Sequence, residues 1–181
     1  MILGMMLVAP LLLLVAGLAA LVIGRQRRRI RVLEAEARQD LLTGLPNRRG
    51  LKAHWEAMPG PAALLLIDLV GFKAVNDSHG HIVGDALLHQ VAARLGNAVP
   101  PPGLVARWGG DEFVGVVPAG TLAEHRERIA ALGARPYDLS ARGGPAAVHV
   151  GARVGACEGE SDLEQAVAVA ARGLLDAKAA A

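Results

Sequence analysis

The chain has 181 residues, of which 19 are Lys or Arg and 17 are Asp or Glu, so its formal net charge is +2. Five arginines fall within residues 25–31, and the rest of the chain holds 14 basic against 17 acidic side chains, a layout that argues against a nucleic-acid-binding face. The hydrophobic content of 52% excludes a disordered chain, and the single cysteine, Cys157, excludes an internal disulfide framework.

Met1 to Ile23 form an uncharged, apolar run that predicts a membrane-spanning helix. About 20 apolar residues suffice to cross the hydrocarbon core of a bilayer. A cleaved signal peptide is the alternative, but such a peptide carries its positive charge before the apolar stretch, whereas here the arginines follow it. Positive charge marks the cytoplasmic side of a span. We therefore expect residues 1–24 to anchor a single-pass protein in the cell (inner) membrane, with the N-terminus outside and the rest in the cytoplasm.

Residues 25–39 predict a basic, helical juxtamembrane stalk, because they contain no Gly or Pro and are rich in helix formers. Ile30, Leu33, Ala37 and Leu41 follow one another at spacings of three, four and four, which makes a narrow apolar seam. Such a seam suits a helix that pairs with a second copy, and it equally suits a solvated connector. Because the seam spans barely two heptads, both interpretations stay open.

Residues 40–181 predict one α/β (α+β) domain in which a central sheet is flanked by helices. A turn cluster at residues 40–49 opens the domain, and the apolar run at residues 62–69 predicts a strand buried on both faces. The whole pattern predicts a helix to Trp55, that strand, a helix at 82–98, a hairpin of strands at 104–107 and 113–117, a helix at 121–132, a strand at 147–156 and a helix from Ser161 to about Lys178. The two later helices open on patterns of the capping-box type, Thr121 with Glu124 and Ser161 with Glu164.

Two patterns in this domain point to chemistry. Asp68 lies near the end of the apolar strand, and a buried carboxylate must be paired, hydrogen-bonded or bound to a metal. Asp111 and Glu112 follow two glycines, whose missing side chains let a ligand approach the backbone. Taken alone, Asp68 is more simply a salt-bridged core residue and the hairpin an ordinary turn. A strand end and a nearby hairpin can, however, converge on one divalent cation such as Mg²⁺.

Four segments, in order, resemble the motifs of the GGDEF family of diguanylate cyclases. Residues 107–113 read RWGGDEF and match the family signature. Residues 40–49 read DLLTGLPNRR, residues 68–73 read DLVGFK, and residues 76–85 hold Asn-Asp, Gly-His and Gly-Asp pairs at the family's spacing. The resemblance covers Asp40 to about Lys178.

This resemblance implies a mainly antiparallel five-stranded sheet with surrounding helices, related to the nucleotidyl cyclase and polymerase palm architecture. Together with the predicted membrane span, it implies a membrane-anchored diguanylate cyclase, which condenses two GTP molecules into cyclic di-GMP and two pyrophosphates. Each domain would hold one GTP, two domains would meet as a homodimer, and Mg²⁺ or Mn²⁺ would neutralise the triphosphate.

The resemblance further assigns roles to residues. Asp68 and Asp111 would be metal carboxylates with the Leu69 carbonyl as a further ligand, and Asp111 or Glu112 would assist deprotonation of the 3′-hydroxyl. Apart from the resemblance, we expect His81 to orient a turn and not to ligate metal. The remaining site residues would be Asn76 and Asp85 at the guanine edge, Gly109 and Gly110 beneath the nucleotide, the amides of Gly71, Phe72 and the catalytic position Lys73 at the phosphates, and the phosphate-binding Lys178.

The match with the family is incomplete. Val70 stands where the family usually has a second Asp, and residues 100–103 read PPPG where a product-inhibition motif R-x-x-D would lie, so we expect no feedback of that type. The last helix reaches Lys178 and three alanines, which leaves the domain short at its C-terminus. The alternative to an active cyclase is therefore a catalytically weak or inactive GGDEF domain that acts as a GTP-binding or partner-binding regulatory module.

Overall fold

The computed structural model describes residues 17–29, 34 and 37–179, and the chain divides into two units, Met1–Ala37 and Arg38–Ala181. In the first unit, residues 17–29 are helical. Within the part of the chain that the structure describes, no helix is both long enough and apolar enough to cross a membrane. Most of the expected span over residues 1–24 lies outside the described residues, because these begin at residue 17.

The expected stalk helix at residues 25–39 is described only in part. Residues 25–29 are helical, whereas residues 30–33, 35 and 36 lie outside the described residues. At its end the prediction is wrong: residues 37 and 38 form a turn, and Gln39 forms an isolated β-bridge with Pro46.

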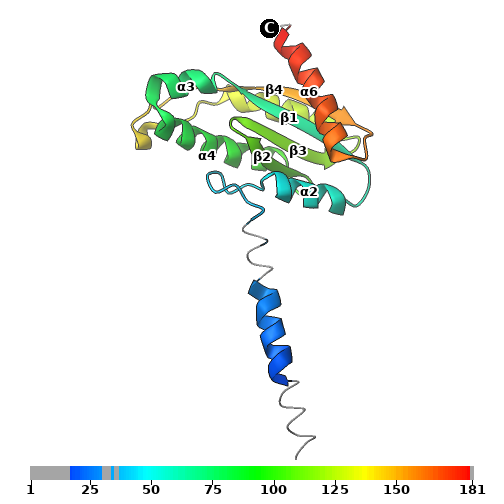
Figure 1. The fold of residues 1–181 in the computed structure, drawn as a ribbon. Helices are drawn as coiled ribbons and strands as arrows, with labels where there is room; N and C mark the ends of the chain where they lie inside the picture. The colour runs from blue at the N-terminus through cyan, green and yellow to red at the C-terminus, as the bar shows by residue number, and fades with distance from the viewer. Residues whose placement is uncertain (1–16, 30–33, 35–36, 180–181) are drawn as a thin grey trace, which may run out of the picture. The chain divides into compact units, whose positions relative to one another are not determined.

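The second unit is built on an antiparallel sheet with strand order β2-β3-β1-β4 (Figure 1). The described residues contribute four strands, where the family resemblance implied five, and the expected antiparallel sheet flanked by helices is confirmed. The last strand begins later than the predicted range of 147–156, because Val148 instead forms an isolated bridge with Tyr137. The strands are β1 (Ala62–Val70), β2 (Leu104–Gly109), β3 (Glu112–Pro118) and β4 (Gly151–Glu158).

Helices lie before, between and after these strands. They are α2 (Arg48–Ala57), α3 (Phe72–His79), α4 (His81–Ala98), α5 (Leu122–Ala130) and α6 (Leu163–Ala179), with short 3-10 turns at Ala131–Ala134 and Ser140–Arg142. The sequence predicted all of these helices except α3, which has only eight residues, most of them exposed. Gly80, with φ of +80°, separates α3 from α4.

The two predicted capping boxes are wrong. The Thr121 hydroxyl donates to the carbonyl of Pro118, and no side chain caps α5. At α6 the carboxylate of Asp162, and not the side chain of Ser161, accepts a hydrogen bond from the backbone amide of Gln165. A four-residue spacing does not decide which oxygen captures the first free amides of a helix, because neighbouring polar side chains compete for them.

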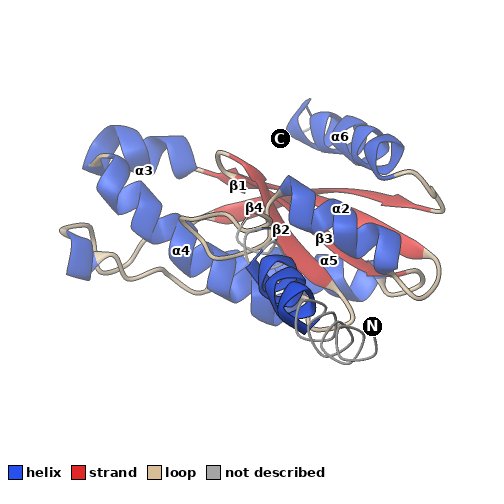
Figure 2. Ribbon diagram, turned by 60° about the horizontal axis from the view of Figure 1, so that its bottom comes forward, coloured by secondary structure: helices blue, strands red, loops and turns tan. Residues whose placement is uncertain are grey.

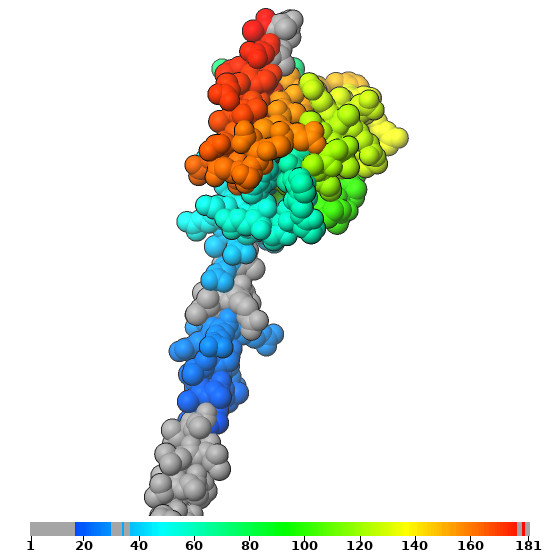
Figure 3. Space-filling view, turned by 90° about the vertical axis from the view of Figure 1, so that its right-hand side faces the viewer, coloured from blue at the N-terminus to red at the C-terminus, as the bar shows by residue number. Residues whose placement is uncertain are grey.

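Helices α2 and α6 lie beside each other on one face of the sheet (Figures 2 and 3). The Trp55 indole of α2 donates to the carbonyl of Ser161, just before α6. Helix α6 also approaches β4 closely, because a Cβ at Gly155 would come within 2.0 Å of the carbonyl oxygen of Ala170. Only glycine permits this approach.

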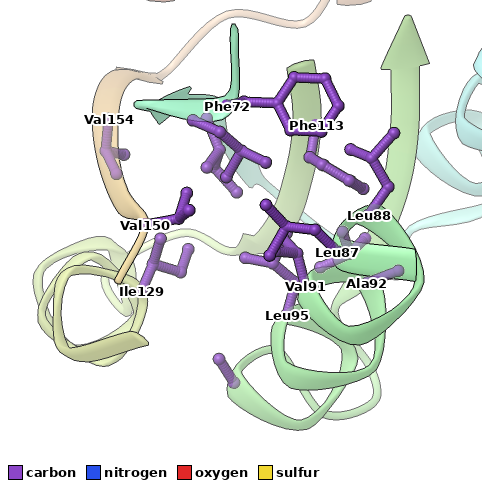
Figure 4. Packing of buried hydrophobic residues seen from close by; sticks show 14 of the residues in the cluster. Phe72, Leu87, Leu88, Val91, Ala92, Leu95, Phe113, Ile129, Val150 and Val154 are labelled. Carbon is purple, nitrogen blue, oxygen red and sulfur yellow. The ribbon is translucent and has the colours of Figure 1, made fainter. Parts of the chain in front are cut away.

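Strand β1 is buried on both faces, as its continuous apolar run predicts. Its odd-numbered residues pack with α3, α4 and α5, and its even-numbered residues pack with α2 and α6. Figure 4 shows the first of these layers, in which Phe72 and Phe113 lie over the row formed by Leu87, Val91 and Leu95 of α4. Burial of each such side chain contributes about 1.5–3 kcal/mol, so the two layers hold the end of β1 firmly in place.

Candidate functional site

The end of β1 carries the buried carboxylate that the sequence predicted. Asp68 is 8% exposed, and in the sheet it lies opposite Glu112 of β3 on one side and Arg153 of β4 on the other. Residues directly opposite each other in an antiparallel pair place their side chains on the same face. Glu112, Asp68 and Arg153 therefore form a row across three strands, on the face that α2 and α6 share. We call this set the strand-end row.

The turn between β2 and β3 brings Asp111 next to the strand-end row. Gly110 has a φ of +54°, in the left-handed region that costs other residues about 1–2 kcal/mol. Asp111 is partly buried, and it immediately precedes Glu112, the partner of Asp68. The register thus places Asp68 directly opposite Glu112, with Asp111 one residue earlier in the hairpin. That Asp68 and Asp111 share one metal ion stays a prediction.

Arg107 ties this turn to the opening segment of the domain. Its guanidinium donates to the carbonyl of Gly110 at 3.0 and 2.8 Å and forms a salt bridge with Asp40 at 3.1 Å. The Asp40 carboxylate also accepts hydrogen bonds from the hydroxyl and the amide of Thr43. Burial raises the pKa of Asp40, but the hydrogen bonds from Thr43 and Arg107 outweigh it, so the pKa lies below its ordinary value. This network fixes the backbone next to Asp111.

Arg48, the first residue of α2, holds the other side of the turn. Its Nε donates to the carbonyl of Trp108 at 2.7 Å, and its guanidinium stacks on the Trp108 ring, 4.3 Å from the ring centroid. Sequence reasoning gave no role to Arg48, Arg107 or Asp40, because contacts between segments some 60 residues apart are not visible in local patterns. The available signal was that all three belong to the family-like motifs.

The loop between β1 and α3 presents the residues expected to meet phosphates. Gly71 has a φ of +90° and precedes the first turn of α3. Phe72 is buried in the core and anchors this turn, whereas Gly71 and Lys73 are exposed. The loop directly follows the strand that carries Asp68. Backbone amides in the first turn of a helix have no partner inside the helix and can bind an anion.

Asn76 and Asp85 lie on the neighbouring helices α3 and α4. A Cβ at Gly84 would fall 1.8 Å from Oδ1 of Asn76, so α4 has a glycine where the Asn76 side chain needs the space. That oxygen is buried and has no hydrogen-bond partner among the described residues. Asp85 is exposed and lines a cavity of about 470 Å³ together with Leu42 and Leu139. The Asn76 oxygen therefore faces Gly84 of α4, whereas the exposed Asp85 carboxylate is open to a ligand that offers N–H donors.

Few of the described side-chain donors gather at the predicted metal site. Among the described residues, no group of three or more His, Cys, Asp or Glu side chains lies close enough together to hold a metal ion. A metal at Asp68 and Asp111 would therefore need further oxygen ligands, such as the carbonyl of Leu69 or a phosphate. His81 is exposed at the start of α4. Lys178 falls within α6, but its side chain lies outside the described residues.

The chain is similar to known proteins in sequence and in fold. Residues 37–181 match the family model described as "Diguanylate cyclase, GGDEF domain". The diguanylate cyclase DgcP of Pseudomonas aeruginosa is 33% identical over 156 residues, which make up 80% of this chain and 23% of that protein. The chain spans between 10% and 45% of the length of the curated relatives compared.

Solved structures share the fold. A sensory box/GGDEF family protein from Caulobacter crescentus is 34% identical, with a TM-score of 0.67 over 80% of this chain and 99% of that one. The coiled coil and GGDEF domain of DgcB from the same organism, solved in complex with c-di-GMP, gives a TM-score of 0.75 over 90% of this chain and 91% of that one. Its identity is 23%, so this second likeness concerns the fold alone.

Proposed function

Because the chain belongs to the GGDEF domain family, we propose that it is a membrane-anchored diguanylate cyclase, which condenses two GTP molecules into cyclic di-GMP and two pyrophosphates. The observation that supports this activity most directly is the pairing of Asp68 with Glu112 across β1 and β3, next to the hairpin residue Asp111. The carboxylates supply charge, and the glycine turn beside them leaves room for a nucleotide.

Mg²⁺ or Mn²⁺ would be held by the carboxylates of Asp68 and Asp111 and by the carbonyl of Leu69. These donors fit the ion, because they are hard oxygen ligands and because Mg²⁺ usually takes only one or two carboxylates and completes its shell with water and phosphate oxygens. Bound there, the ion would neutralise triphosphate charge.

The chain's own groups would hold GTP. The amide of Asn76 and the carboxylate of Asp85 would hydrogen-bond the guanine edge, where N1 and N2 are the donors that distinguish this base from adenine. The amides of residues 71–73 and the ammonium group of Lys178 would meet the phosphates. Asp111 or Glu112 would accept the proton of the attacking 3′-hydroxyl.

We also propose a homodimer and a membrane location. Each domain would hold one GTP and the product joins two, so two copies must meet. The uncharged run of residues 1–24 and the five arginines that follow support a span in the inner membrane, with the N-terminus outside and the domain in the cytoplasm.

Incubation of the 181-residue chain with GTP and Mg²⁺ at high protein concentration tests this proposal. We expect cyclic di-GMP and pyrophosphate from the parent chain and from Glu127→Ala, an exposed control on α5, and no product from Asp111→Ala. Binding of GTP without any product would refute the cyclase and leave the regulatory module. Turnover by Asp111→Ala at the parent rate would refute the assignment of Asp111.

A further inference from the structure

Arg153 is the one member of the strand-end row to which the proposed function gives no role. It lies on β4 directly opposite Asp68, and such opposite positions have Cβ atoms about 4.5–5.5 Å apart. Glu112 flanks Asp68 from the other side. An arginine therefore adjoins the candidate metal carboxylate on the same face of the sheet.

In the described part of the chain, neighbouring elements hold the backbone of Arg153 in place but do not bind its side chain. Strand β4 pairs with β1 on one side, and α6 packs against β4 at Gly155, two residues further along. The Arg153 side chain is partly buried, yet it forms no ion pair or side-chain hydrogen bond with the residues that the structure describes. A guanidinium has five donors to satisfy, so a partly desolvated one beside a candidate metal site is well placed to take an anion.

We propose that Arg153 binds the terminal phosphates of the nucleoside triphosphate and stabilises the departing pyrophosphate. The inference rests on the proposed nucleotide site at Asp68. A triphosphate held there would carry its anionic groups into reach of a long side chain that starts one strand away. Arginine suits this task, because its planar fork binds phosphate oxygens through paired, charge-assisted hydrogen bonds.

The contribution of Arg153 to catalysis follows from the electron flow of the condensation. The 3′-oxygen forms a bond to the α-phosphorus of the second GTP, and its proton passes to Asp111 or Glu112. The bond from the α-phosphorus to the bridging oxygen breaks, and pyrophosphate leaves with the electron pair. Negative charge therefore grows on the groups that Arg153 would contact, and a fixed cation there stabilises the transition state.

Equilibrium binding of 3′-deoxy nucleotides in the presence of Mg²⁺ tests this role without turnover, because they lack the attacking hydroxyl. We expect Arg153→Gln to weaken binding of 3′-deoxy-GTP about tenfold or more, since hydrogen bonds to charged groups contribute roughly 1.5–3 kcal/mol. Binding of 3′-deoxy-GMP should stay unchanged. Arg153→Lys should recover part of the loss, and Arg126→Gln, at an exposed position on α5, should bind both nucleotides like the parent chain.

The binding results distinguish a phosphate-binding Arg153 from an arginine that only supports the fold or competes with the metal for Asp68. No loss of 3′-deoxy-GTP binding, or an equal loss for both nucleotides, would overturn it. Tighter triphosphate binding by Arg153→Gln would mean that the arginine competes with the metal for Asp68, which would also overturn it. If Arg153→Gln fails to fold by circular dichroism, Arg153→Lys decides, because the shorter fork-less cation should still lose triphosphate binding selectively. A parent chain that makes no cyclic di-GMP but shows the selective loss would refute the proposed activity and retain this inference.

Discussion

Gly84 and Gly96 both lie in α4, yet they meet different surroundings. A Cβ at Gly84 would fall 1.8 Å from Oδ1 of Asn76, whereas a Cβ at Gly96 would meet nothing within 4 Å. A glycine inside a helix costs about 0.5–1 kcal/mol relative to alanine. At Gly84 this cost is offset by the room given to Asn76, and no packing contact offsets it at Gly96.

We expect Gly84→Ala to displace the Asn76 side chain and to weaken GTP binding about tenfold, as loss of one well-placed polar contact does. Gly96→Ala, the matched control, should raise the free energy of unfolding by about 0.5–1 kcal/mol and leave GTP binding unchanged. Urea unfolding and calorimetric titration with GTP measure both effects. Equal GTP affinity in the two variants would speak against Asn76 as a base contact.

Asp40 makes the stability of the folded domain depend on pH in the acidic range. Burial alone would raise its pKa, but the bonds from Thr43 and Arg107 lower it, so folding stabilises the ionised carboxylate. This contribution is complete above the unfolded pKa and is lost as the pH falls through the folded pKa. We expect the difference in unfolding free energy between the parent chain and Asp40→Asn to be constant near neutrality and to shrink below about pH 4. Urea unfolding from pH 7 to pH 3 checks this; a difference that does not shrink would contradict an ionised Asp40 in the folded domain.

At the scale of elements, the contact between α6 and β4 decides how closely a helix can cover the sheet. Gly155 allows the backbone of α6 to approach at Ala170, and the Cβ of any other residue would meet that carbonyl oxygen at 2.0 Å. Gly151, at the start of the same strand, would have only ordinary contacts with Val70.

We expect Gly155→Ala to lower the free energy of unfolding by about 1–3 kcal/mol, because overpacking forces α6 and β4 apart. Gly151→Ala should leave stability unchanged or raise it by up to about 1 kcal/mol, because alanine restricts the unfolded chain more than glycine does. Guanidinium unfolding of both variants provides the comparison. A Gly155→Ala variant as stable as the parent chain would mean that α6 is not held where the structure has it.

Elements with a strong pattern could be predicted from the sequence, and short polar ones could not. The run Ala62–Val70 and the helical spacing of α4 each carry enough apolar residues to reveal their type. Helix α3 has eight residues and only two buried side chains, Phe72 and Val75, so no periodicity emerges. At the start of β4 the pattern misleads instead, because Val148 alternates like a strand residue but forms an isolated bridge with Tyr137.

Site residues that belong to a motif could be predicted from the sequence. Residues that only the strand register brings to the site could not. Asp68 and Glu112 were identified from motifs, and the register then placed them side by side. Arg153 gave no signal, because its position beside Asp68 depends on the pairing of β1 with β4. Arg107 belongs to the signature motif, but its salt bridge with Asp40 joins segments that local patterns do not connect.

At the scale of the whole molecule, a single domain offers one set of site residues, and the proposed product needs two nucleotides. We therefore expect cyclic di-GMP formed per chain to rise with protein concentration and to level off once dimers dominate. Initial rates over a dilution series, with sedimentation velocity on the same samples, measure this. A constant rate per chain in samples that sediment as monomers would contradict catalysis by a dimer.

The strand order β2-β3-β1-β4 also has a consequence for how the chain is made. Strand β1 emerges first from the ribosome, and both of its neighbours come later, β4 last of all. Asp68 and its partner Arg153 are 85 positions apart, a delay of roughly 4–17 s at about 5–20 residues per second. During that interval one edge of an almost wholly apolar strand has no pairing partner, a state prone to aggregation. The nascent chain should therefore depend on chaperones most strongly between the synthesis of β1 and that of β4, and the site is assembled only when the last strand arrives.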